Sequence, residues 1–152
     1  MEIIYRKATK KDVKTIESLF TQMLFTIYKN PAIKQYEKGY LDRFFTALKD
    51  CIFVAELNNV VVGYISINVF NDNLRYLYID DFCVDKDFRN KGIGTKLLSM
   101  VENYAKEIGI GDICLHVEKT NVLAKNLYDR NGYSVFKVEG TKILMNKIIL
   151  KK

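Results

Sequence analysis

The sequence predicts a mixed α/β fold, with a mixed, mostly antiparallel sheet flanked by helices on both faces. Three observations lead to this class. Two segments of helical periodicity stand before residue 50, three strand-like runs then follow with short turns between them, and a strand, a glycine loop, a helix and another strand fill residues 75–117. Short turns join antiparallel strands, whereas a helical crossover joins parallel ones. The expected order is therefore β-α-α-β-β-β-α-β-α-β-β, in a single domain over residues 1–152.

The chain is expected to begin with a strand and a helix. Residues 2–8, EIIYRKA, are interpreted as a short strand. Thr9 and Asp12 form a T-x-x-D capping signal, and apolar residues between Val13 and Leu24 recur at helical spacing. We therefore place the first helix directly after Thr9.

A second helix is expected over residues 31–48. Pro31 suits the first turn of a helix, because the N–H group that proline lacks would have no intrahelical partner there. Gly39 weakens this prediction, since glycine has a low helix propensity. One stripe of this helix is expected to face the core: Ile33, Tyr36, Tyr40, Leu41, Phe44, Phe45 and Leu48.

Three consecutive strands are expected next. CIFVAEL at residues 51–57 and VVVGYISINVF at residues 60–70 flank Asn58-Asn59, a pair that tolerates the positive φ angles of a tight hairpin. The turn NDN then leads to RYLYIDDFCV at residues 75–84. These runs predict antiparallel neighbours.

Helices and strands alternate in the second half of the chain. After the glycine loop, apolar residues from Leu97 to Ile108 form an amphipathic helix that ends at Gly109, where a left-handed C-cap costs little. The remaining elements are a strand at residues 112–117, a helix at residues 121–131 closed by Gly132, and a hairpin of strands at residues 133–138 and 142–150.

Composition and charge narrow the classes of function. The net charge of +6 suggests a polyanionic ligand, but the lysines are scattered, with no block of five like charges and no basic stripe interleaved with aromatics. No apolar run approaches the roughly 18 residues of a membrane-spanning helix, and the first residues lack the pattern of a signal peptide. We therefore expect a soluble, cytoplasmic protein that binds neither nucleic acid nor a membrane.

The cysteines and the single histidine do not predict a metal site. Cys51, Cys83 and Cys114 are odd in number and each lies in an apolar stretch, so we expect buried free thiols. His116 lies on an expected strand without partners at metal-ligand spacing. We expect it to be packed and hydrogen-bonded.

The loop DFRNKGIGTK, residues 87–96, is the first candidate binding site. It places Gly92 and Gly94 among basic side chains at a helix start, where N–H groups lack intrahelical partners and carry a partial positive charge. A phosphate group is the natural ligand of such a site. The loop fits neither the P-loop pattern nor the dinucleotide fingerprint, which has its third glycine where this chain has Leu97. On this motif alone, a turn without a ligand stays the alternative.

Three motifs in the same order resemble those of the GCN5-related N-acetyltransferase (GNAT) superfamily. VDKDFRNKGIGTKLL resembles the R/Q-x-x-G-x-G/A signature, IIYRKATKKDVKTI is similar to the opening strand and helix, and NVLAKNLYDRNGYSV resembles the N-x-x-A-x-x-x-Y-x-x-x-G-[FY] segment. The resemblance covers nearly the whole chain. It implies a GNAT fold, acetyl-CoA as cosubstrate, and acetyl transfer to a primary amine by direct attack in a ternary complex.

The resemblance also implies a cofactor site. Backbone groups of Phe82, Cys83 and Val84 are expected to bind the acetyl and pantetheine part, with the amide of Val84 as oxyanion donor to the thioester carbonyl. Asn121 resembles the residue whose side chain contacts the cofactor, and it is equally a candidate helix N-cap. The pyrophosphate is expected to lie against the loop residues Arg89, Asn90, Lys91, Gly92, Ile93, Gly94 and Thr95.

Tyr128 matches the general acid of the family, which protonates the departing CoA thiolate. The alternative is a core tyrosine, because Ala124 and Leu127 share its helix face. The spacing of the motif favours catalysis.

Asp80 is the expected general base. IDDFCV resembles E-D-F-F-V of the polyamine acetyltransferases in this superfamily, whose first acid is the base. Asp80 and Asp81 are adjacent on a strand, so we expect their side chains on opposite faces, with Asp80 on the face of Phe82 and Val84. Aspartate is one methylene shorter than glutamate, which favours a bridging water, and Glu118 is the reserve candidate.

The acceptor stays open among small amines or polyamines, aminoglycoside-like molecules, and protein N-termini or lysines. Five tyrosines are candidates to line its site, although core packing is the preferred interpretation of each: Tyr28, Tyr36, Tyr40, Tyr76 and Tyr78. A covalent relay through Cys83 is discounted, because its apolar flanks offer no cation to lower the pKa of its thiol. A non-catalytic acyl-CoA-binding regulatory module on the same fold is the alternative function. Tyr128 and the acidic pair favour an enzyme, and a homodimer stays open.

Overall fold

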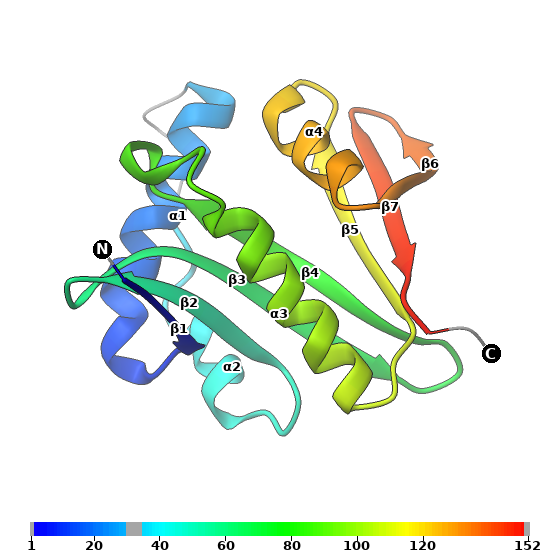
Figure 1. The fold of residues 1–152 in the computed structure, drawn as a ribbon, viewed down its shortest axis with the longest axis horizontal. Coiled ribbons are helices and arrows are strands. Elements are labelled where there is room, and N and C mark those ends of the chain that lie inside the picture. Colours follow the sequence, from blue (N-terminus) through cyan, green and yellow to red (C-terminus); the bar gives the residue numbers. More distant parts are fainter. Residues whose placement is uncertain (1, 30–34, 151–152) are drawn as a thin grey trace.

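A seven-stranded mixed sheet forms the centre of the computed structural model, which describes residues 2–29 and 35–150 (Figure 1). Its strands lie in the order β1-β2-β3-β4-β5-β7-β6, and neighbours are antiparallel except β4 and β5. The strands are β1 Ile3–Lys7, β2 Cys51–Leu57, β3 Val60–Asn71, β4 Arg75–Val84, β5 Asp112–Glu118, β6 Ser134–Glu139 and β7 Lys142–Ile148. The predicted class and element order are confirmed.

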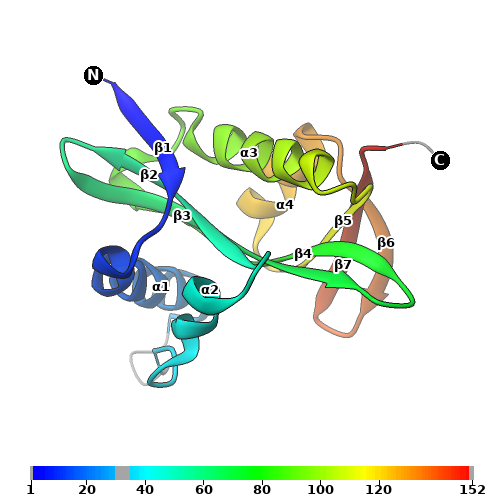
Figure 2. The same cartoon turned by 90° about the horizontal axis from the view of Figure 1, so that it is seen from below.

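Helices cover both faces of the sheet (Figure 2). The helices of one face are α1 Val13–Tyr28 and α2 Arg43–Thr46, and those of the other are α3 Ile93–Glu107 and α4 Val122–Arg130. Each face has its own apolar core, with Ile16 and Phe44 in the first and Leu97 and Val101 in the second. The helical spacing of apolar residues thus directs one stripe of each long helix onto the sheet.

The predicted second helix is much shorter than expected. Within the described part of residues 31–48, the α-helix is limited to α2, and a 3-10 turn over Tyr40–Asp42 precedes it. Gly39 has a φ angle of 82°, which is left-handed and incompatible with a continuous right-handed helix. Leu48 is 95% exposed instead of facing the core. Two more residues of that prediction lie outside the described residues: Pro31 and Ile33.

Strand β4 has an open edge toward β5. The two strands pair only at Leu77, Tyr78 and Ile79, and beyond these residues they separate (Figure 1). On its other side, β4 pairs with β3 along almost its whole length. Within residues 2–29 and 35–150, the second half of β4 therefore has one edge without a neighbouring strand.

Strand β4 also contains a bulge. Ser66 of β3 lies opposite Asp81, whereas the next residue, Ile67, lies opposite Ile79. Asp80 is therefore the extra residue, and the alternation of side chains shifts at this point.

Among the described residues, no helix combines the length and apolarity that crossing a bilayer requires.

Candidate active site

Two adjoining pockets lie where β4 and β5 separate. The first, of about 380 Å³, lies between β4, the loop before α3, and α4. The second, of about 330 Å³, lies between α1 and the ends of β4 and β5. We call them the loop pocket and the carboxylate pocket, because Asp80, Asp81 and Glu118 line the second. The residues that line both are Met23, Ile27, Phe82, Asn121, Ala124 and Tyr128.

The start of α3 opens into the loop pocket. Gly92 caps the helix, and the first intrahelical bond runs from the Lys96 N–H to the Gly92 carbonyl at 3.0 Å. The N–H groups of Ile93, Gly94 and Thr95 therefore have no intrahelical acceptor, and all three residues line the pocket. This end of the helix can bind an anion.

The two glycines of the loop have different roles. Gly92 has a φ angle of 80°, and a Cβ atom placed on it would meet no atom within 4 Å. A Cβ atom on Gly94 would lie 3.1 Å from the Leu127 side chain and 3.2 Å from the Phe82 ring. Gly92 therefore provides a left-handed turn with open space before it, and Gly94 allows α3 to pack closely against α4 and β4.

The free edge of β4 presents two amides to the gap. The N–H groups of Asp81 and Asp85 donate to β3, at 3.0 and 2.8 Å. Because the N–H groups of successive strand residues point to opposite sides, those of Phe82 and Val84 point toward β5. The Val84 carbonyl lies on that side as well, where it accepts a hydrogen bond of 3.1 Å from Arg89 Nε.

Most of the predicted cofactor residues line the loop pocket: Phe82, Cys83, Val84, Arg89, Asn90, Gly92, Ile93, Gly94, Thr95 and Asn121. Lys91 is not among the lining residues. The Cys83 thiol donates to the Leu19 carbonyl at 3.2 Å, and burial raises the pKa of this thiol to about 12. Cys83 is therefore a poor nucleophile. Cys51 is buried as expected, whereas Cys114 is only partly buried.

Helix α4 and its N-cap provide two of the predicted residues, which line both pockets. Asn121 is its N-cap, and Asn121 Oδ1 accepts a hydrogen bond of 3.3 Å from the Ala124 N–H. Tyr128 is 6% exposed and lies where the two pockets meet, with its ring centroid 6.1 Å from that of Phe82. Burial raises the pKa of Tyr128, so its phenol holds its proton through the neutral and alkaline range.

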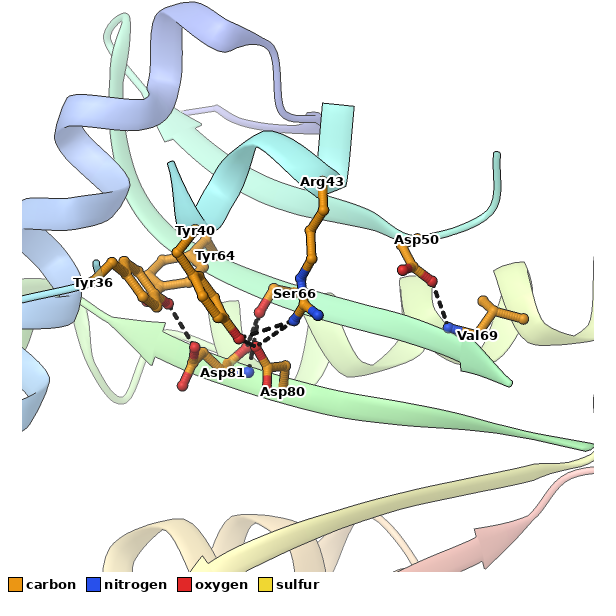
Figure 3. Close-up of polar contacts among 9 residues, drawn as sticks. All are labelled: Tyr36, Tyr40, Arg43, Asp50, Tyr64, Ser66, Val69, Asp80 and Asp81. Atoms are coloured by element: carbon orange, nitrogen blue, oxygen red, sulfur yellow. Dashed lines mark hydrogen bonds and ion pairs between the residues drawn. The ribbon is translucent and has the colours of Figure 1, made fainter. Parts of the chain in front are cut away.

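The side chains of Asp80 and Asp81 point to the same face of the sheet, so the expected opposite orientation is wrong. Tyr40 donates to Asp80 Oδ2 at 2.5 Å, and Tyr36 donates to Asp81 Oδ2 at 2.6 Å (Figure 3). The two tyrosines stack on each other, whereas Phe82 packs against the core on the α3 face. The bulge at Asp80 is the physical reason, because the extra residue cancels one step of the alternation.

Polar contacts hold the aspartates in place (Figure 3). The buried Ser66 Oγ accepts a hydrogen bond of 3.0 Å from the Asp81 N–H. Arg43 approaches Asp80 Oδ2 at 3.4 Å. Burial raises the pKa of the Asp81 carboxyl to about 6, against the opposing effect of the hydrogen bond from Tyr36.

A chain of three side chains, Tyr78, His116 and Glu139, borders the carboxylate pocket, and the sequence analysis did not assign the last of them. Tyr78 OH lies 2.7 Å from His116 Nδ1, and His116 Nε2 lies 3.0 Å from Glu139 Oε1. His116 is hydrogen-bonded as expected, but its side chain is 33% exposed instead of packed in the core. Strand alternation could have placed Tyr78 on the face of Asp80. No local signal indicates Glu139, which reaches His116 only through the pairing of β5, β7 and β6.

Acidic groups predominate in the carboxylate pocket. Glu118, the reserve base, accepts a hydrogen bond of 3.1 Å from Tyr28 at the end of α1. Lys142 and His116 are the basic side chains of the same lining. Within the described ranges, no three His, Cys, Asp or Glu side chains gather as a metal site requires. The pocket can attract a cation.

Comparisons with known proteins identify related sequences. The model of the acetyltransferase (GNAT) family matches residues 21–133. An uncharacterized N-acetyltransferase of Methanocaldococcus jannaschii is 34% identical over 132 residues, which cover 86% of this chain and 78% of that protein. Streptothricin acetyltransferase A of Bacillus subtilis is 31% identical over 113 residues, which cover 74% of this chain and 64% of that protein.

Solved structures with the same fold are also found. The PaiA N-acetyltransferase of Thermoplasma acidophilum, crystallised in complex with coenzyme A, superposes with a TM-score of 0.82 at 21% sequence identity. The alignment covers 97% of this chain and 99% of that chain.

Proposed function

The chain belongs to the GNAT family of acetyltransferases, and from that premise we propose that it transfers an acetyl group from acetyl-CoA to a primary amine. One observation carries the proposal. A pocket built on a helix N-terminus and a pocket lined by carboxylates meet at a buried tyrosine. The first suits a phosphorylated cosubstrate, the second suits an ammonium ion, and the tyrosine supplies a proton between them.

The loop pocket fits acetyl-CoA, which supplies the acetyl group as a thioester when it is bound. The unpaired amides of Ile93, Gly94 and Thr95 would hold the pyrophosphate, with open space in front of Gly92. The free edge of β4 would hold the pantetheine part through backbone hydrogen bonds. In this arrangement the amide of Val84 would donate to the thioester carbonyl and stabilise negative charge on its oxygen.

Tyr128 is proposed as the general acid. Its raised pKa keeps the phenol protonated, so it can donate to the departing thiolate, which takes the proton as the C–S bond breaks. Its position at the junction of the two pockets supports this role.

We assign Asp80 and Asp81 the binding of the ammonium group, instead of assigning proton removal to Asp80 alone. Both carboxylates line the same pocket and each accepts a short hydrogen bond from a phenol. Even the Asp81 carboxylate, with its pKa raised to about 6, is a weak proton acceptor for an ammonium group whose pKa is near ~10. A pair of carboxylates is better suited to hold the cation than to deprotonate it.

The proton of the amine is proposed to leave through Tyr78 and His116. Glu139 lies against Nε2, which favours the tautomer with its proton there and leaves Nδ1 as acceptor for the Tyr78 hydroxyl. The amine then gives its proton to the Tyr78 oxygen while Tyr78 passes its own to Nδ1. Glu139 would stabilise the resulting imidazolium, and the partly exposed side chain would then pass the proton to water.

The test is release of free thiol from acetyl-CoA with a panel of primary amines. The panel contains small diamines, aminoglycoside-like amines, and peptides with free N-termini or lysines. We expect turnover with at least one class and none with the same molecule after dimethylation of its amine, which keeps the positive charge but blocks acetylation. Binding of acetyl-CoA without turnover on any acceptor would contradict the proposal and favour a regulatory module.

A further inference from the structure

A stack of aromatic rings lies behind the two aspartates. Phe20 and Tyr36 stack with ring centroids 3.7 Å apart, and Tyr36 and Tyr40 stack at 4.9 Å. The Arg43 guanidinium covers the Tyr40 ring at 4.8 Å and the Phe44 ring at 4.7 Å. Packing therefore fixes the two tyrosine rings independently of their hydroxyl groups.

Each tyrosine hydroxyl points at a different carboxylate (Figure 3). Tyr36 donates to Asp81 and Tyr40 donates to Asp80, at 2.6 and 2.5 Å. Both distances are short for O–H···O bonds and fall in the range of charge-assisted ones. The Tyr64 hydroxyl lies 3.0 Å from that of Tyr36 and donates to it, because the proton of Tyr36 is used toward Asp81.

Neither tyrosine is among the lining residues of the carboxylate pocket, whereas both aspartates are. We propose that Tyr36 and Tyr40 are positioning residues of the acceptor site, which orient the carboxylates of Asp81 and Asp80 to receive an ammonium group. The inference rests on the proposed function of the pocket. We call the two tyrosines the tyrosine clamp.

The clamp is needed because two neighbouring carboxylates in a partly buried site oppose each other's ionisation. Burial and the charge of Asp80 both raise the pKa of Asp81, whereas the hydrogen bond from Tyr36 lowers it. Without that donor, a larger fraction of Asp81 is protonated at neutral pH. The charged and titratable groups that face or influence Asp81 are Tyr36, Tyr40, Arg43, Tyr64, Tyr78, Asp80, Cys83 and Tyr128.

The Tyr36→Phe and Tyr40→Phe variants keep the stacked rings and remove only the hydroxyl groups. We expect the KM for the amine to rise about tenfold at neutral pH in each variant, because a hydrogen bond to a charged group is lost. The KM for acetyl-CoA should change little, whereas the melting temperature should fall moderately, because each variant loses a part-buried hydrogen bond. In Tyr36→Phe, the acidic limb of kcat/KM for the amine should also move to higher pH.

A matched control is Tyr76→Phe. Tyr76 lies on β4, as the two aspartates do, and stacks on Phe70 of β3, but it is not among the lining residues of either pocket. This variant should leave every kinetic constant at its wild-type value. A clamp variant that folds but keeps both the amine KM and the pH limb of the wild type would overturn the inference.

The ionisation of Asp81 can also be followed without turnover, by carboxyl 13C NMR as a function of pH. The apparent pKa of Asp81 should rise in Tyr36→Phe and stay unchanged in Tyr76→Phe. An unchanged pKa in Tyr36→Phe overturns the clamp whatever the enzyme assays show. A wild-type protein without turnover on any amine refutes the proposed function instead, so the two failures are distinguishable.

Discussion

Asp80 and Asp81 are neighbours in the chain, and their carboxylates lie on the same side of the sheet, each under a tyrosine hydroxyl. At the bulge that aligns them, the Asp81 N–H donates a hydrogen bond of 3.0 Å to a side-chain atom, Ser66 Oγ. The geometry of the two carboxylates therefore depends on one buried hydroxyl on the neighbouring strand.

Ser66→Ala should lower the free energy of unfolding by about 1–3 kcal/mol, because it leaves the Asp81 N–H without its acceptor in a buried place. Urea unfolding measures this change. Ser134→Ala on the exposed strand β6 is the control, and it should cost less than about 0.5 kcal/mol. Equal costs for the two variants would show that the Ser66 contact contributes nothing.

Asp81→Asn should stabilise the protein at neutral pH and weaken binding of the amine. The folded state raises the pKa of Asp81 to about 6, above its usual value near ~3.9, so folding favours the protonated form. The stability that the protonated carboxyl contributes is fully present below about pH 4 and is lost as the pH rises through 6. Asparagine does not ionise and can still accept from Tyr36. The variant should therefore gain on the order of 2 kcal/mol over the wild type at pH 7, with a much smaller gain at pH 4 in parallel urea titrations. An equal gain at both values would contradict the shift.

Tyr128→Phe should lower kcat about 10- to 100-fold, while the affinity for acetyl-CoA is retained. Tyr133→Phe is a matched control, because Tyr133 is equally buried, its ring contacts that of Tyr128, and its hydroxyl has no hydrogen-bond partner within the described chain. Steady-state kinetics of both variants measure the difference. Wild-type kcat in Tyr128→Phe would remove this residue from the mechanism.

Gly92→Val should weaken acetyl-CoA binding at least tenfold, because the side chain occupies the open space before α3. The variant also strains the backbone, since Gly92 has a φ angle of 80°. Gly140→Val controls for this strain, because Gly140 in the β6–β7 turn has a φ angle of 63° and open space around it. Both variants should have a lower melting temperature than the wild type. Acetyl-CoA should still raise the melting temperature of Gly140→Val, but not that of Gly92→Val. If acetyl-CoA raises the melting temperature of both variants, the loop does not hold the cosubstrate.

His116→Gln and Tyr78→Phe should each lower kcat about 10- to 100-fold at neutral pH, because both interrupt the path of the amine proton. The double variant should be no slower than the slower single variant, since two residues that act as one unit have non-additive effects. Kinetics of the three variants with one acceptor test this. Multiplied losses in the double variant would show that the residues act separately.

The sequence predicted the parts of the site that local motifs encode. The glycine loop, the N-cap Asn121 and the position of Tyr128 on α4 all follow from short spacings within one segment. The orientation of Asp80 could not be predicted, because period-two alternation holds only without a bulge and the bulge depends on pairing with β3. Tyr36 and Tyr40 were predicted to face a helix core, since their spacing fits a helix that Gly39 interrupts. The contact of Glu139 with His116 requires the order of β5, β7 and β6, which no local pattern contains.

The short pairing between β4 and β5 has a consequence for the energetics of the whole sheet. From Asp80 onward, β4 has a neighbouring strand on one side only, so this half of the sheet is incomplete in the protein alone. A cosubstrate whose amide groups bind along that edge would take the place of the missing strand segment. The cohesion between the two halves of the molecule would then depend on the concentration of a metabolite, and the polypeptide would reach its full rigidity only in the complex that carries out the reaction.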